Sequence, residues 1–154
     1  MEGCIFCSIV DGSVKSFKIY EDERYIAILD KFPNIEGQTL VIPKRHIESY
    51  AFAIGDSDLS EFIITTKRVA KLLERGLGVS RVHLVLEGTE IDHLHAKLYP
   101  AIGIGNRDNG IGVTVHPKPV KFSEYPGYIT TISGKEADDK YLGRVRDRIL
   151  SGTS

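Results

Sequence analysis

Three nitrogen-bearing side chains alternate with apolar residues in one short stretch: His93, His95 and Lys97. If the stretch is a β-strand, the three share one face, with successive members about 7 Å apart. Two imidazoles and an ammonium make a poor hydrophobic core and a good site for an anion. The alternative is a solvent-facing strand that carries them by chance. The pattern favours an anion site, with the intervening apolar residues packed in the core.

A second group of candidate residues begins with Cys4 and Cys7, which are the only cysteines of the chain. Together with His46 they supply three of the four ligands that zinc takes in a tetrahedral site, and His93 is the natural candidate for the fourth. The alternatives are a redox pair or an incidental pair on one helix face. A redox motif is expected between a strand and a helix, whereas this pair lies at the start of the chain. Its position favours a metal.

The overall composition describes a globular chain of 154 residues, with 42% hydrophobic and 27% charged residues. A formal net charge of −1 predicts no field for a long nucleic acid, so a nucleic-acid partner would be a small nucleotide. No segment approaches the roughly 18 apolar residues that a membrane span needs, and the first residues do not form a signal peptide. These features predict a cytoplasmic protein without a membrane partner.

The periodicity of apolar residues predicts an α+β fold, in which an antiparallel sheet of about five strands is accompanied by separate helices. The expected strands are residues 17–20, 25–29, 38–42, 81–86 and 93–99. We expect a single domain over residues 1–154, with a core at about 3–100. An irregular insertion follows at 101–127, and a C-terminal segment with a helix at 128–154.

Apolar stripes at helical spacing predict a short helix over 4–11, a long helix over 58–77 and a terminal helix over 137–150. Asp56 and Ser57 are suitable N-caps for the long helix, and Gly76 or Gly78 can end it. The long helix is therefore expected to cover the sheet that carries the histidines.

Two blocks of the sequence resemble the histidine triad (HIT) family, in the branch with an N-terminal zinc site. The first block is CIFCSIVDGSV followed by KIYEDERYIAILDKFPNIEGQTLVIPKRH, and the second is DHLHAKLYP, which is similar to the family signature His-x-His-x-His. The resemblance covers about residues 3–100. It implies a HIT-like fold and a homodimer whose sheets join across the interface.

The resemblance also assigns roles to several residues. The zinc ligands of the family match Cys4, Cys7, His46 and His93. Because four protein ligands leave no open position, the zinc would be structural. His95 matches the residue that attacks the α-phosphorus and forms a nucleotidyl-histidine intermediate, and an imidazole is mostly neutral at pH 7.

The nucleoside-binding positions of the family fall on Asp30, Ile26 and Phe6. Asp30 matches an acidic residue that binds the ribose hydroxyls, and the alternative is a solvated carboxylate at the end of a strand. Ile26 and Phe6 lie near the positions that line the base pocket, although both could also be ordinary core residues.

The chain departs from the family pattern at Lys97, which replaces the third histidine. At about 4 Å and an effective dielectric constant of about 20, a lysine attracts a phosphate charge by about 4 kcal/mol. This attraction acts on bound substrate and transition state alike, so it favours affinity more than rate. Lysine also supplies a proton poorly near neutral pH. We therefore expect firm nucleotide binding with slow turnover, or a need for a good leaving group.

The turn before the signature, residues 87–92, departs as well. The family places Asn, Gly and Gln or Ser there, whereas this chain reads EGTEID. Thr89 could donate one hydrogen bond to a phosphate, but three carboxylates bring negative charge to the place where an anion is expected. Lys97 would partly offset that charge.

The expected function is hydrolysis or nucleotidyl transfer at the α-phosphate of a purine nucleotide derivative: a phosphoramidate, a dinucleoside polyphosphate or an adenylylated conjugate. The acceptor would be water, a phosphate or a sugar phosphate. The alternative from another class is a nucleotide-binding or regulatory protein that has kept the pocket and lost the chemistry. Covalent adduct formation on His95 separates the two.

Overall fold

The computed structural model describes residues 3–103 and residue 140. The chain divides into two units, Met1–Gly112 and Val113–Ser154, and the first contains the candidate site. The expected terminal helix, apart from residue 140, and most of the expected insertion lie outside the described residues. None of the helices described is long and apolar enough to cross a membrane.

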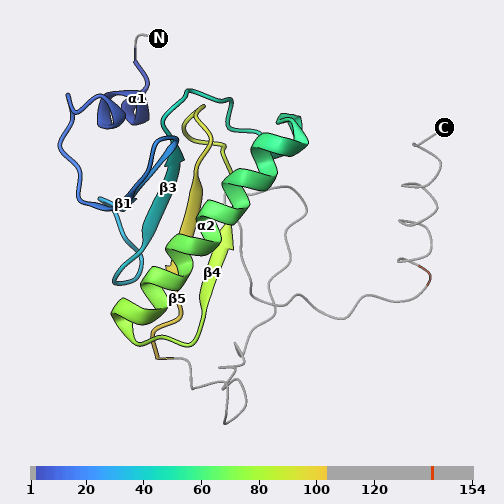
Figure 1. Cartoon of the computed structure of the whole chain (residues 1–154). Helices are drawn as coiled ribbons and strands as arrows, with labels where there is room; N and C mark the ends of the chain where they lie inside the picture. Colours follow the sequence, from blue (N-terminus) through green and yellow to red (C-terminus); the bar gives the residue numbers. More distant parts are fainter. Residues whose placement is uncertain (1–2, 104–139, 141–154) are drawn as a thin grey trace. The chain divides into compact units, whose positions relative to one another are not determined.

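The described part has the α+β architecture that the sequence predicts, with one antiparallel sheet in the order β1-β2-β3-β5-β4 (Figure 1). The strands are β1 (Lys18–Glu21), β2 (Tyr25–Leu29), β3 (Thr39–Pro43), β4 (Val82–Val85) and β5 (Ala96–Pro100). The helices are α1 (Ile5–Val10), the single 3-10 turn η1 (Ala51–Ala53) and α2 (Asp56–Leu77). The predicted hairpin is β1–β2, with Lys18 paired to Ile28 and Glu21 to Ile26.

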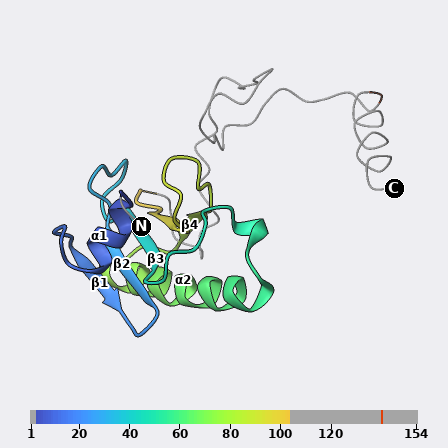
Figure 2. The same cartoon turned by 90° about the horizontal axis from the view of Figure 1, so that it is seen from above.

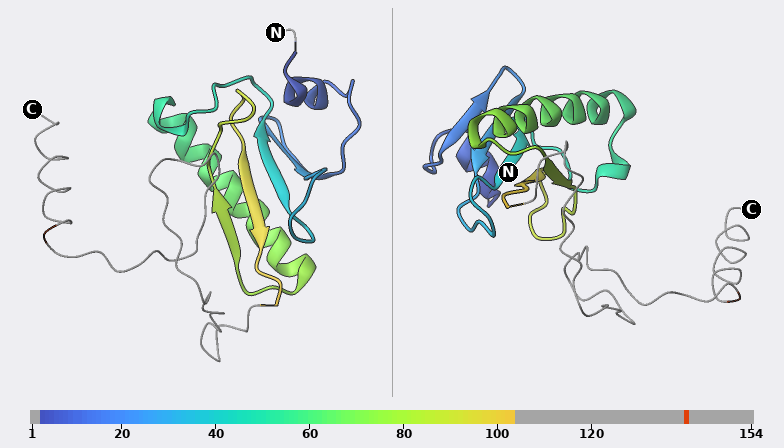
Figure 3. Two further views of the ribbon diagram at one scale, coloured as in Figure 1. Left: turned by 180° about the vertical axis from the view of Figure 1, so that it is seen from behind. Right: turned by 90° about the horizontal axis from the view of Figure 1, so that it is seen from below.

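The two faces of the sheet are covered by different helices, as Figure 2 shows. On one face, Ala27, Val41 and Leu98 pack with Phe62 and Val69 of α2. On the other face, residues of β2 and β3 pack against α1. All five residues of β3 are buried, because this strand lies in the middle of the sheet with a helix on each side. β5, which follows the two histidines directly, lies next to this central strand (Figure 3).

Three boundaries or faces differ from the sequence predictions, whereas the predicted end of α2 at Gly78 is confirmed. Gly55, not Asp56 or Ser57, is the N-cap of α2, and Asp56 and Asp58 lie inside the first turn, where their charge favours the helix dipole. Gly78 ends α2 in a left-handed conformation with φ +64°, as its type allows.

The other differences concern the strands near the site. β5 begins only at Ala96, so His93 and His95 precede it, although the alternation of faces continues through them. Leu94 packs on the α2 side with Ala96 and Leu98, whereas both histidine rings contact Phe6 of α1. On the edge strand β4, Leu84 is 43% exposed, because this strand has a neighbour on only one side.

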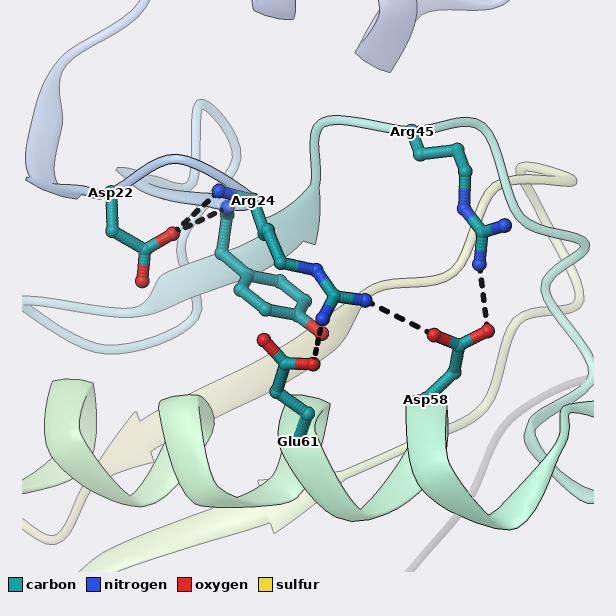
Figure 4. Close-up of polar contacts among 6 residues, drawn as sticks. Asp22, Arg24, Arg45, Asp58 and Glu61 are labelled. Atoms are coloured by element: carbon teal, nitrogen blue, oxygen red, sulfur yellow. Dashed lines mark hydrogen bonds and ion pairs between the residues drawn. The ribbon is translucent and has the colours of Figure 1, made fainter.

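A network of ion pairs joins the β1–β2 turn, the segment after β3 and the start of α2 (Figure 4). Arg24 pairs with both Asp58 and Glu61, and Arg45 pairs with Asp58 at 2.6 Å. These side chains are partly exposed, so each pair contributes little to the free energy of unfolding. In the same turn, the Asp22 carboxylate accepts hydrogen bonds from the Arg24 and Tyr25 amides.

Candidate functional site

Four metal-ligating side chains from three separate segments meet at one end of the sheet. Cys4 caps α1 and Cys7 lies within it, so three-residue spacing places both thiols on the same side of the helix. His46 comes from the segment after β3, and His93 from the segment before β5. One ligand atom from each of the four lies within 4.8 Å of the others. The structure therefore brings together the set that the sequence analysis proposed as ligands.

The hydrogen bond of His93 determines which nitrogen faces the thiols. Its Nε2 lies 2.9 Å from the carbonyl oxygen of Pro43. Since a carbonyl only accepts, Nε2 carries the proton, and in the neutral ring Nδ1 keeps its lone pair. Burial lowers the pKa of His93, which favours that neutral ring. A buried imidazole with a fixed tautomer is a suitable metal ligand.

Three of the distances between the donor atoms fit a tetrahedral ion. The Nδ1 atom of His93 lies 3.3 Å from Sγ of Cys4 and 3.6 Å from Sγ of Cys7. The Nδ1 atom of His46 lies 3.4 Å from Sγ of Cys7. Zinc bonds of ordinary length at tetrahedral angles place sulfur and nitrogen about 3.5 Å apart. The four residues could therefore hold a metal ion.

Solvent reaches the Cys/His cluster through a cleft of about 440 Å³ that Cys4, His46 and Asp92 help to line. Burial, followed by the neighbouring Cys4 thiol, raises the pKa of the Cys7 thiol. A cation at the centre of the cluster would reverse this effect, because metal binding favours the thiolate.

His95 is held by its own backbone neighbour and by α1. Its Nδ1 lies 2.8 Å from the carbonyl oxygen of His93, so Nδ1 is the protonated nitrogen and Nε2 keeps the lone pair. The ring contacts Phe6 edge-on, with 5.0 Å between centroids, and the residue is 4% exposed. Burial, and then the Lys97 charge, lowers the pKa of His95. The result is a neutral imidazole with a basic Nε2, which is the form that acts as a nucleophile.

Lys97 and Thr89, both expected to face an anion, are engaged by one carboxylate. The ammonium of Lys97 lies 3.3 Å from Oε2 of Glu87. The hydroxyl of Thr89 donates to Oε1 of the same residue at 2.6 Å. The Thr89 hydroxyl, and then Lys97, lowers the pKa of Glu87 against the opposing effect of burial, so the carboxylate is ionised at neutral pH. The sequence analysis expected Lys97 to offset the charge of this turn but did not identify Glu87 as its partner.

The acidic turn is fixed to the segment that follows His46. The Ser49 hydroxyl donates to the Gly88 carbonyl at 2.7 Å, and the Ser49 amide donates to Oδ1 of Asp92 at 2.9 Å. Gly88 has φ +67°, and a Cβ there would lie 2.6 Å from the Ser49 carbonyl oxygen. Only glycine therefore fits this position well. Sequence reasoning missed Ser49, since a serine after a strand carries no signal of its partners.

The residues expected at the ribose and the base are placed as follows. Asp30 lies at the end of β2, where its carboxylate accepts from the Gln38 side-chain amide at 2.6 Å and the Phe32 backbone amide at 2.8 Å. Ile26 is 1% exposed and belongs to the core between the sheet and α1. Phe6 belongs to the same core and is 4% exposed, with its ring against His93 and His95.

The sequence and the fold of the chain are similar to those of known proteins. The HIT domain family model matches residues 11–100. A HIT family hydrolase from Clostridium thermocellum is 31% identical, with a TM-score of 0.60 over 68% of this chain and 96% of that chain. A hypothetical histidine triad nucleotide-binding protein from Sulfolobus tokodaii is 27% identical, with a TM-score of 0.59 over 94% and 87%. A Zn-bound histidine triad family protein from Mycobacterium smegmatis is 29% identical, with a TM-score of 0.57 over 64% and 74%.

Proposed function

The chain belongs to the histidine triad (HIT) family, and on that premise we propose that it hydrolyses or transfers the nucleotidyl group of a purine nucleotide derivative through His95. The observation that carries the proposal is the hydrogen bond from Nδ1 of His95 to the His93 carbonyl. This bond leaves Nε2 basic in a neutral ring and lets the backbone carbonyl stabilise the charge that the ring gains during attack. A hydrolase and a nucleotide-binding protein among the similar structures support the reaction class.

The proposed reaction has two displacement steps. The Nε2 lone pair attacks the α-phosphorus, a P–N bond forms, and the leaving group departs with the electron pair of its bond to phosphorus. Water or another acceptor then attacks phosphorus, His95 leaves with the P–N electron pair, and the acceptor's proton passes to solvent. Because Lys97 is paired with Glu87, the proton that an amine leaving group needs would come from solvent water, whereas a pyrophosphate leaving group needs none.

Zinc is the metal that we propose for the Cys/His cluster. Cys4, Cys7, His46 and His93 would hold it in a closed tetrahedral site, where it supplies structural cross-linking and no open position for substrate. The Zn-bound relative from M. smegmatis supports the choice of metal. The carbonyl of His93 binds His95, so a fixed His93 also fixes the proposed nucleophile.

We also propose that the protein is a homodimer and lies in the cytoplasm. The described sheet has two edge strands, β1 and β4, and we propose that the second sheet joins at β4, where Leu84 is exposed. Asp30 is proposed to bind the ribose, and Thr89 the phosphate. Each would have to share or release the hydrogen bonds that it makes within the chain.

A second candidate function is nucleotide binding without turnover. The observation in its favour is the pairing of Glu87 with both Lys97 and Thr89, because it withdraws two expected phosphate contacts. A binding protein would keep saturable affinity for nucleotides but would form no covalent intermediate.

The test is hydrolysis of adenosine 5′-phosphoramidate, run beside equilibrium binding of AMP, for the wild type, His95→Ala and His83→Ala. His83 is an exposed histidine of β4, so its variant is a matched control. We expect turnover in the wild type and in His83→Ala and a loss of at least about a thousandfold in His95→Ala. Nucleotide binding without turnover in the wild type would support the second candidate. Equal turnover in all three proteins would overturn the role of His95.

A further inference from the structure

Glu87 contacts both of the residues that were expected to face an anion, Lys97 and Thr89. Oε2 of Glu87 lies 3.3 Å from the Lys97 ammonium, and Oε1 accepts a hydrogen bond from the Thr89 hydroxyl at 2.6 Å. The side chains of Lys97 and Glu87 are only 20% and 18% exposed, so the pair is screened less by solvent than a surface pair would be. A full negative charge therefore lies beside the one cation of the signature stretch.

The backbone that carries Glu87 is fixed from outside the turn. Ser49 binds the carbonyl of Gly88, and the close approach of Ser49 to Gly88 leaves no room for a Cβ. Asp92 at the far end of the turn accepts from the same serine. Both ends of residues 88–92 are held by Ser49, so the backbone that follows Glu87 is fixed.

The electrostatic consequence depends on the charge of the phosphate. A lysine alone attracts a dianion about twice as strongly as a monoanion, because Coulomb energy is proportional to the ligand charge. A carboxylate beside that lysine repels each ligand in the same proportion. The pair is close to neutral as a whole, and so it removes the preference for a dianion.

We propose that Glu87 is a specificity-determining residue that cancels Lys97 and so directs the site towards singly charged, doubly substituted phosphates. Nucleoside phosphoramidates and nucleoside phosphate esters belong to this class. Nucleoside monophosphates, which hydrolysis would release, are dianions above their second pKa of about 6 and gain no advantage. The inference rests on the proposed function, and its consequence is that Lys97 does not retain the product.

The experiment compares the dissociation constants of AMP and of adenosine 5′-(methyl phosphate) at pH 8 by titration calorimetry. The two ligands differ by one charge and one methyl group at the phosphate. The proteins are the wild type, Glu87→Gln, Lys97→Met, the double variant and Glu74→Gln. Glu74 pairs with Lys71 on α2, so its variant removes the same charge from a lysine–glutamate pair outside the site.

We expect the wild type and Glu74→Gln to bind the two ligands within about threefold of each other. Glu87→Gln should shift the ratio about tenfold in favour of AMP, which is about 1.4 kcal/mol. Lys97→Met should shift it in the opposite direction, because the carboxylate then acts alone. The double variant should return close to the wild-type ratio. Lys97→Met also serves as the second test if Glu87→Gln does not fold.

Two results would overturn the inference, and they are distinguishable. If Glu87→Gln changes the affinity for both ligands by the same factor, Glu87 only supports the turn, while nucleotide binding itself stands. If the wild type binds neither ligand, the proposed function fails and the inference fails with it.

Discussion

The two ends of the His93–Lys97 stretch differ in how their charges and ligand atoms are balanced. Around His93, four neutral or weakly acidic donors converge on a common centre and could be joined by a cation. Around Lys97, opposite charges already pair with each other, and the Thr89 hydroxyl completes the carboxylate's contacts. His95 lies between the two regions and binds the backbone of the first. The site could therefore bind a cation at the His93 end, whereas at the Lys97 end the lysine charge is already balanced by a carboxylate.

The largest expected effect comes from removing the metal at the Cys/His cluster. Chelation, or Cys7→Ser, should lower the free energy of unfolding by about 4 kcal/mol at free zinc a thousandfold above its dissociation constant. Thermal unfolding with and without zinc measures this change. Ser8→Ala, next to Cys7 on α1, is the control and should retain its zinc response. If neither zinc nor the chelator changes the unfolding midpoint, the Cys/His cluster does not bind a stabilising metal, and the proposed contrast with the Lys97 end fails.

Phe6 connects the two regions, because its ring contacts both His93 and His95. Phe6→Ala deletes a buried aromatic ring and should cost about 3 kcal/mol in urea unfolding of the metal-loaded protein. Phe52→Ala is the matched control, since Phe52 is 85% exposed, and should cost less than about 0.5 kcal/mol. Similar losses for the two variants would mean that α1 does not pack on the histidines as described.

The acidic turn is tested by comparing two glycines with nearly equal positive φ. Gly78→Ala should cost about 1 kcal/mol, because its Cβ meets nothing and only the left-handed conformation is strained. Gly88→Ala should cost about 2–3 kcal/mol, since its Cβ would also meet the Ser49 backbone. Urea unfolding measures both. Equal losses would show that Ser49 does not fix the turn.

The smallest effect is on the pH dependence of stability. Burial holds the pKa of His95 below its usual value near 6.5, so the unfolded chain takes up a proton first as the pH falls. Stability should therefore be complete above pH 6.5 and decline from there towards the lowered folded pKa. Unfolding of metal-free protein at several pH values should show a smaller decline for His95→Gln than for the wild type. A steeper decline in the variant would contradict the assignment.

The sequence predicted the fold and the convergence of the metal-ligating side chains, because both depend on residue types and spacing. Cys-x-x-Cys on one helical turn places two thiols together, and the alternation at His93–Lys97 separates the histidine face from the Leu94 face. The identity of Glu87 as the partner of Lys97 could not be predicted from the sequence. It depends on the path of a turn that Ser49 fixes from a distant segment.

Nucleotidyl transfer through His95 is tested most directly by the intact mass of the protein after brief mixing with adenosine 5′-phosphoramidate, with quenching that avoids acid. We expect a gain of one adenylyl group in the wild type and in His83→Ala and no gain in His95→Ala. Turnover of the same substrate without any adduct in the wild type, or an adduct that persists in His95→Ala, would contradict nucleotidyl transfer through His95.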